Sequence, residues 1–192
     1  MSYNYQEHFD WVAEHATRPR YYQRQFHAQR LALYRHHIPE GSRILEAGMA
    51  EGDLLAQLAP SRGLGLDFSP KMVARAQQRH TQAHLEFRQA DVQTASLDET
   101  FDAIILDDLC QYLDDVQLTL TQLRQAAHPR TRLYLTSFNQ AWRPWLALAR
   151  SLGMAVRHPV SNWLSRADLT NLLELAGWEV VRCQTEQLFP FQ

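Results

Sequence analysis

Residues 44–53 read ILEAGMAEGD: a short apolar run that ends in an acid, then a turn with two glycines, then residues that can start a helix. The apolar run is typical of a buried strand. Gly48 and Gly52 let the backbone turn sharply and pass close to a bound group. The stretch therefore predicts a strand, a tight turn and a helix, with a binding position at the turn.

The same order of apolar run and helical segment repeats along the chain. The predicted strands are Arg43–Ala47, Gly63–Phe68, His84–Arg88, Phe101–Asp107 and Thr131–Ser137. The predicted helices between them are Asp53–Ala59, Pro70–Arg79 after the capping residue Ser69, and Asp114–Ala127. This alternation predicts an α/β fold with a doubly wound, Rossmann-like, mainly parallel sheet and helices on both faces.

Two segments lie outside this alternation. Residues 1–40 contain a predicted helix at Tyr21–His37, and we interpret them as an N-terminal helical lid. Residues 41–192 form the predicted ligand-binding domain, with an insertion at 137–165 that carries Trp142, Trp145 and Trp163. After the insertion we expect a helix capped by Ser165 and ended by Gly177, and a last strand at Glu179–Gln184.

Composition narrows the class of protein. A chain of 192 residues that is 45% hydrophobic fits one globular domain, and its net charge of −2 disfavours a nucleic-acid partner. Cys110 and Cys183 are too few for a disulfide framework, and the adjacent His36 and His37 lack metal-ligand spacing, so we expect no metal. Without a signal-peptide pattern or a membrane-length apolar run, a cytoplasmic location is expected.

Acids at the predicted strand ends outline a nucleoside site. Asp67 can accept both hydroxyls of a ribose, and Asp91 can accept from an adenine amine, with the N–H of Val92 available to the ring. A nicotinamide dinucleotide would want GxGxxG, which is absent, and Glu46 and Glu51 would repel its pyrophosphate. Carboxylates suit the cationic S-adenosylmethionine better.

Four stretches, ILEAGMAEGD, GLGLDFSPKMVARAQQR, QADV and FDAIILDDL, together resemble the first four motifs of class I S-adenosylmethionine-dependent methyltransferases, particularly those acting on small molecules. The resemblance implies S-adenosylmethionine as cofactor and S-adenosylhomocysteine as product. Its implied cofactor-binding residues are Glu46, Gly48, Met49, Ala50, Gly52, Asp67, Phe68, Asp91, Val92 and Asp107. Ala50 departs from the family pattern, which has a glycine at that position.

A narrower resemblance joins residues 20–22, 55–67, 128–133, 162–165 and 171–177 to bacterial methyltransferase domains that are sometimes fused to family 2 glycosyltransferases. It implies a glycosyltransferase or a membrane-associated partner. Related chains complete the sheet with one more strand, so a last strand is expected to be missing here. The exposed edge would then favour a homodimer.

Methyl transfer is an in-line displacement that needs no enzyme nucleophile, and a general base only when the acceptor must lose a proton. The candidate catalytic residues are Asp107, Asp108 and Tyr22. Other side chains that could reach the crevice are Tyr21, Gln111, Tyr112, Asn139 and Trp142, and spacing singles out none of them. The expected acceptor is a small molecule, with lipid-linked and sugar-linked ones included.

Two other functions stay open at this point. One is a catalytically inactive member of the same fold with a regulatory or scaffolding role. The other is an NAD-dependent Rossmann-like oxidoreductase.

Overall fold

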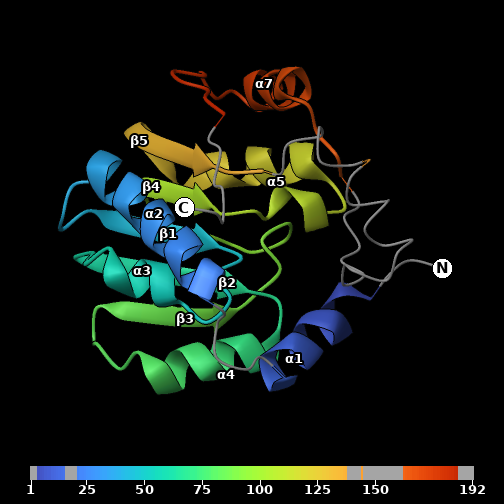
Figure 1. The fold of residues 1–192 in the computed structure, drawn as a ribbon. Coiled ribbons are helices and arrows are strands. Elements are labelled where there is room, and N and C mark those ends of the chain that lie inside the picture. Colours follow the sequence, from blue (N-terminus) through green and yellow to red (C-terminus); the bar gives the residue numbers. More distant parts are fainter. Residues whose placement is uncertain (1–3, 16–20, 138–143, 145–161, 186–192) are drawn as a thin grey trace.

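A five-stranded parallel sheet forms the centre of the molecule in a computed structural model that describes residues 4–15, 21–137, 144 and 162–185 (Figure 1). The strand order is β3-β2-β1-β4-β5, and every neighbouring pair is parallel. The strands are β1 (Arg43–Ala47), β2 (Arg62–Asp67), β3 (Leu85–Gln89), β4 (Phe101–Leu106) and β5 (Ala127–Leu135). Because the order reverses beside β1, the carboxyl ends of β1 and β4 form the switch point at which such folds bind ligands.

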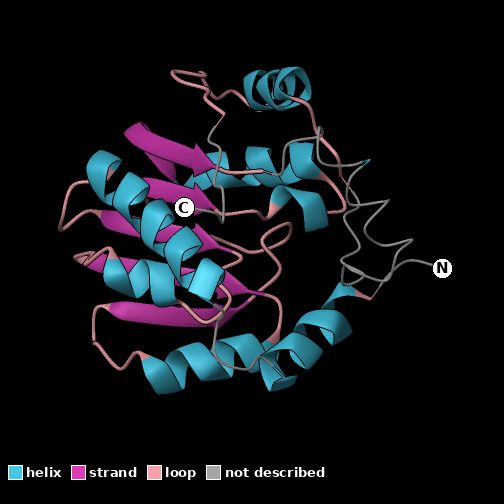
Figure 2. Ribbon diagram, in the orientation of Figure 1, coloured by secondary structure: helices cyan, strands magenta, loops and turns pink. Residues whose placement is uncertain are grey.

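Helices cover both faces of the sheet, as the sequence predicts (Figure 2). One face packs against α2 (Tyr21–His37), α3 (Asp53–Gln57) and α4 (Pro70–Arg79), and the other against α5 (Val116–Leu123) and α7 (Arg166–Leu175). A further helix, α1 (Tyr5–His15), runs beside α4, and short 3-10 turns lie at η1 (Cys110–Tyr112) and η2 (Arg124–Ala126). The doubly wound fold class is therefore confirmed.

Capping residues place the helices where the sequence predicts them. The Ser69 hydroxyl accepts from the Met72 N–H at the start of α4. Ser165 and Asp168 form a reciprocal capping box at the start of α7, and Gly177 follows that helix with a positive φ of 80°. Such caps satisfy backbone groups that the first helical turn leaves without partners.

The end of the third predicted helix differs from the structure. The helix α5 stops at Leu123, and β5 already begins at Ala127, so Pro129 lies within a strand. Among the described residues β5 is an edge strand, where a proline without an N–H breaks no ladder bond. Pro129 and the exposed Arg130 and Arg132 also disfavour pairing of this edge strand with a strand of another chain. The predicted homodimer stays a prediction.

The last predicted strand, Glu179–Gln184, is wrong. These residues are irregular, and Val181 is 69% exposed. Trp178, just before them, is buried against α5, where its indole N–H donates to the carbonyl of Leu120 at 3.0 Å. The alternating pattern that suggests a strand therefore belongs to a segment that leaves the core after this anchor.

The two segments outside the alternation have different positions. Tyr34 of α2 and Ile38, just after this helix, are buried in the core, so α2 is a layer of the fold. The predicted lid stays a prediction. Most of the insertion at 137–165, including Trp142 and Trp145, lies outside the described residues. No helix in the described part of the chain is long and apolar enough to cross a membrane.

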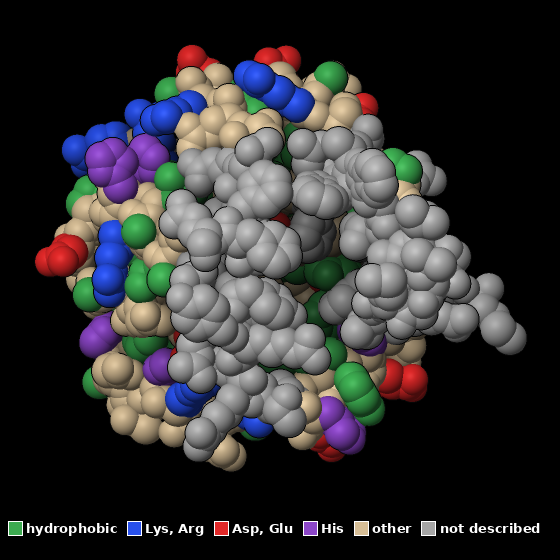
Figure 3. Space-filling model, viewed as in Figure 1, with side chains coloured by type: hydrophobic (Ala, Val, Ile, Leu, Met, Phe, Trp, Pro, Cys, Tyr) green, Lys and Arg blue, Asp and Glu red, His purple; other side chains and the backbone are tan. Residues whose placement is uncertain are grey.

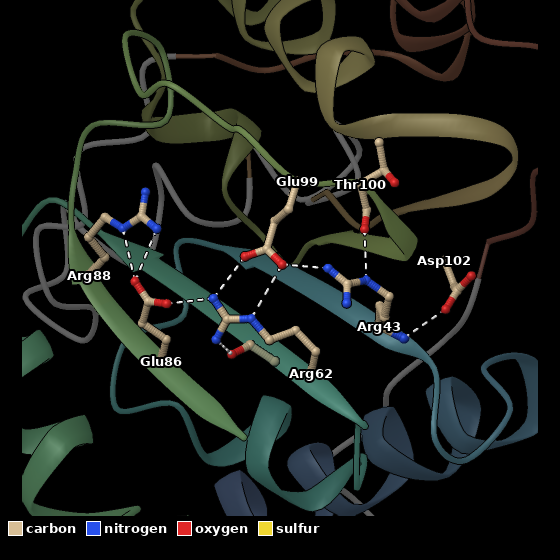
Figure 4. Close-up of polar contacts among 8 residues, drawn as sticks. Arg43, Arg62, Glu86, Arg88, Glu99, Thr100 and Asp102 are labelled. Carbon is tan, nitrogen blue, oxygen red and sulfur yellow. Dashed lines mark hydrogen bonds and ion pairs between the residues drawn. The ribbon is translucent and has the colours of Figure 1, made fainter. Parts of the chain in front are cut away.

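An ion-pair network ties the strands together at the edge of the sheet where they begin (Figure 4). Glu99, just before β4, accepts from Arg43 at the start of β1 at 2.5 Å and from Arg62 at the start of β2 at 2.8 Å. Arg62 also pairs with Glu86 of β3. The network joins the beginnings of four strands, opposite to their carboxyl ends.

Glu99→Gln is expected to lower the free energy of unfolding by about 1 kcal/mol, because two arginines lose a shared, partly exposed carboxylate. Urea unfolding measures the loss, which should shrink at about 1 M salt as charges are screened. The exposed Glu40→Gln serves as the control and should leave stability unchanged. A salt-independent loss would contradict an ionic role for Glu99.

Candidate functional site

The turn after β1 lies against the end of β2. The N–H groups of Gly48 and Met49 both donate to the Leu66 carbonyl, at 2.8 and 3.1 Å. Gly48 and Gly52 each have a φ of 73°, which side chains rarely adopt. A Cβ at Gly48 would lie 2.8 Å from Leu109, and one at Gly52 would lie 2.6 Å from the Phe87 ring. Both glycines are thus required by the backbone path and by the packing.

The Asp67 carboxylate is held against this turn. It is 7% exposed and accepts from the N–H of Ala50 at 3.0 Å through one oxygen and from the N–H of Ser69 at 2.9 Å through the other. Burial raises the pKa of Asp67 to about 6, and the two backbone donors oppose that shift. Each carboxylate oxygen keeps a lone pair for a further hydrogen bond, as a ribose contact requires.

The other acids of the turn differ in orientation. Glu46 is buried and accepts from the Leu55 N–H at 3.0 Å, and burial raises its pKa well above the usual range. Glu51, expected to line the crevice, instead pairs with Arg75 at 2.6 Å and with Arg79, both on α4. The prediction that Glu51 adds negative charge to the site is therefore wrong, because two guanidinium groups neutralise it.

The remaining predicted cofactor residues divide by exposure. Asp91 is exposed and accepts from the Gln93 N–H at 2.9 Å, an Asx turn that follows β3. Val92 and Met49 are buried in the core, so any ligand contact would use their backbones. Phe68 is partly exposed and packs edge-on against Phe9 of α1, with ring centres 5.8 Å apart.

Asp107 and Asp108 meet a buried arginine of α2. Arg30 donates to Asp107 at 2.6 Å, to Asp108, and to the Thr136 hydroxyl at 3.2 Å. The Tyr34 hydroxyl also donates to Asp107, at 2.8 Å. Burial raises the pKa of Asp107, and the positive charge of Arg30 opposes the shift.

This cluster limits what Asp107 can do. Its two oxygens already accept from Arg30, Tyr34 and Thr136, which favours a role in joining α2 to the ends of β4 and β5. Asp108 has a φ of 52°, a conformation that costs free energy and is often found at functional sites. Of the two acids, Asp108 is the more exposed.

Several residues that contribute side chains to the candidate site were not predicted from the sequence. Arg30 and Tyr34 lie on one face of α2 with the buried Ile38, each four residues from the next, and this spacing is the signal that could have found them. Asp10 of the unpredicted α1 accepts from the Ser69 hydroxyl, beside Asp67. The sequence bears no comparable mark for this contact, because a single acid has no spacing that singles it out.

Several other predicted candidates lie outside the described residues. The side chains of Tyr21 and Tyr22, and all of Asn139 and Trp142, fall outside the described residues. The described residues contain no cluster of three or more groups that could hold a metal.

A group of basic and histidine side chains covers the end of α2, including Arg35, His36 and His37, near the beginnings of the strands (Figure 3).

Ala50 stands where the family pattern has a glycine, and its φ of 50° lies in the left-handed region. A residue with a Cβ adopts this conformation at a cost in free energy. Ala50→Gly is expected to raise the free energy of unfolding by about 0.5–1 kcal/mol in urea. The control Ala56→Gly, within α3, should lower it by a similar amount. Equal losses in the two variants would contradict strain at Ala50.

A glycine turn and a buried acid at the end of the second strand, at the switch point of a doubly wound sheet, define a Rossmann-like nucleoside-binding protein. A family model described as a methyltransferase domain matches residues 15–182. The chain belongs to this family, and the class I S-adenosylmethionine-dependent methyltransferase predicted from the sequence is confirmed.

Two curated relatives agree with this assignment over part of their length. Malonyl-[acyl-carrier protein] O-methyltransferase from Bacillus cytotoxicus is 35% identical over 85 residues, which are 42% of this chain and 30% of that protein. Nodulation protein S from Sinorhizobium fredii is 34% identical over 87 residues, which are 44% of this chain and 38% of that protein. The matched region thus spans about a third of these relatives.

A solved structure shares the fold over nearly the whole chain. Magnesium protoporphyrin IX methyltransferase from Synechocystis PCC 6803, with bound S-adenosylhomocysteine, superposes with a TM-score of 0.70. It is 20% identical, and the match covers 96% of this chain and 93% of that one.

Proposed function

We propose that this protein transfers the methyl group of S-adenosylmethionine to a small-molecule acceptor. The observation that carries the proposal is the buried Asp67 carboxylate, held by the Ala50 and Ser69 N–H groups at the edge of a glycine turn. A carboxylate fixed in this way is ready to accept two vicinal hydroxyls without reorganising. We assign Asp91 and Val92, which follow β3, to the adenine, and Glu46, Gly48 and Gly52, at the end of β1 and in the turn after it, to the methionine end.

Bound S-adenosylmethionine supplies an electrophilic methyl group, and the protein contributes mainly by aligning the reacting groups. Among the described residues, the Asp108 carboxylate, just after β4, is our candidate for a contact with the methyl acceptor. This carboxylate is held by an ion pair with Arg30. We therefore assign Asp108 to orienting a donor group of the acceptor, and we assign no proton abstraction to it.

One similar protein is named as an O-methyltransferase of a malonyl group and another as an N-methyltransferase. These names suggest two classes of acceptor to screen, carboxylates and amines. The proposal also includes a glycosyltransferase or membrane-associated partner and a homodimer. α1 is the proposed lid, because Phe9 packs on Phe68 and Asp10 binds Ser69 at the entrance to the ribose position.

Calorimetric titration with S-adenosylmethionine, S-adenosylhomocysteine and NAD tests the proposal. Binding of the two sulfur nucleosides without NAD is the expected result. Binding of NAD alone would instead indicate an oxidoreductase. Donor binding without methyl transfer to any acceptor in a broad screen would favour an inactive scaffolding member.

Donor binding is expected to depend on pH through Asp67. Its pKa of about 6 means that the carboxyl group becomes protonated below that pH and loses acceptor capacity for ribose hydroxyls. The Kd for S-adenosylhomocysteine should therefore rise as pH falls from about 7 to about 5, by up to about tenfold per unit. Asp67→Asn should bind weakly and without this dependence, whereas a flat profile in the wild type would contradict the assignment.

A further inference from the structure

The side chain of Gln111 is buried without a hydrogen bond of normal geometry. Gln111 lies in η1, just after β4, and is 1% exposed. Neither its amide nitrogen nor its amide oxygen makes such a bond in the part of the chain that the structure describes. The amide lies near the Tyr112 hydroxyl and opposes the rise that burial causes in the pKa of Tyr112. A buried amide without well-formed hydrogen bonds is costly, and native proteins seldom keep one without a use for it.

Neighbouring polar groups are satisfied, so the site is not simply a poorly packed region. The side-chain amide of Asn162 donates to the carbonyls of Cys110 and Leu113, at 3.1 and 2.6 Å, on either side of Gln111. The buried Thr119 hydroxyl donates to the Asp115 carbonyl at 2.8 Å. Gln111 thus lies beside polar side chains that make their hydrogen bonds.

Gln111 lies between the proposed donor site and α1. Leu109, two residues earlier, fills the space above Gly48 in the glycine turn. Tyr112, the next residue, packs edge-on against Phe9 and Tyr5 of α1, with ring centres 5.2 and 5.7 Å apart. The segment that carries Gln111 therefore forms a wall shared by the glycine turn and the underside of α1.

We propose that Gln111 binds the methyl acceptor and determines its specificity, an inference that rests on the proposed function. Its amide offers one acceptor and two donors, which fits a polar acceptor with a hydroxyl, amine or carboxyl group near the methylated atom. The donor nucleoside already has Asp67, Asp91 and the glycine turn for its polar groups. Because Gln111 is buried, the acceptor reaches it only after groups that cover the amide move.

The first test needs no ligand. Gln111→Leu replaces the amide by an apolar group of similar size, so the midpoint of thermal unfolding should rise by about 2–4 °C. Asn162→Leu is the matched control and should lower the midpoint, because two carbonyls lose their donor. A midpoint of Gln111→Leu below that of the wild type would show that the amide supports the fold, and would overturn the proposal.

The second test separates acceptor from donor. Calorimetry should give Gln111→Leu a Kd for S-adenosylhomocysteine within about twofold of the wild type. Transfer of labelled methyl to malonyl-coenzyme A or to glucosamine, whichever the wild type uses, should fall at least about tenfold in kcat/KM. Unchanged transfer, or a tenfold loss of S-adenosylhomocysteine affinity, would overturn the assignment. A wild type that binds no S-adenosylhomocysteine would refute the proposed function, whereas the thermal comparison would still decide whether the Gln111 amide is kept for a ligand.

Discussion

Asp67→Ala is expected to weaken the binding of S-adenosylhomocysteine at least about 100-fold. The side chain is the proposed acceptor for both ribose hydroxyls, and hydrogen bonds to a charged group contribute roughly 1.5–3 kcal/mol each. Each 1.4 kcal/mol corresponds to about tenfold in Kd, so the loss of two such bonds gives this factor. Isothermal titration calorimetry on the folded variant measures it directly.

The control for this experiment must separate binding from stability. Asp67 also accepts from the N–H groups of Ala50 and Ser69, so the variant is expected to be less stable as well as weaker in binding. Calorimetry is therefore run well below the unfolding midpoint, with circular dichroism as a check on folding. The control is Asp98→Ala, at an exposed acid in the loop before β4, and this variant should bind S-adenosylhomocysteine normally. Normal binding by folded Asp67→Ala would refute the ribose assignment.

The positions of the strand ends could be predicted from sequence because they depend on local signals. The apolar run before Gly48, the acid at the end of β2 and the capping residue Ser69 each act within a few residues of their own position. In a parallel sheet the carboxyl ends of neighbouring strands meet, so the order of the runs was enough to bring Gly48 and Asp67 together.

The contacts between distant segments could not be predicted in the same way. Arg30 and Asp107 are far apart in sequence, and only the packing of α2 on the sheet brings them together. Glu51 lies in the glycine turn, and its orientation depends on two arginines of α4. The strand expected at Glu179–Gln184 fails for a related reason, because a strand needs a partner edge as well as an alternating pattern.

Arg30→Met is expected to lower the free energy of unfolding by about 3 kcal/mol, which is large compared with the effect of a surface ion pair. The substitution removes the guanidinium that pairs with both Asp107 and Asp108, while keeping most of the apolar stem. Two neighbouring, mostly buried carboxylates would then repel each other without a countercharge. Chemical denaturation of wild type and variant measures the difference, and Arg132→Met on the exposed face of β5 is the control.

The pH dependence of this loss identifies its cause. In the wild type, burial raises the pKa of Asp107 and Arg30 opposes the shift, so removing Arg30 should raise that pKa further. A carboxyl group with a raised pKa in the folded state destabilises the protein above its unfolded pKa and loses that penalty as it becomes protonated. The deficit of Arg30→Met should therefore be largest near pH 8 and shrink towards about pH 5. Adding Asp108→Asn to Arg30→Met should recover part of the stability at the higher pH, because one of the two repelling charges is gone. A deficit that is the same at both pH values, and that Asp108→Asn leaves unchanged, would mean that Arg30 stabilises α2 by packing alone and that the acids at the end of β4 are held independently of it.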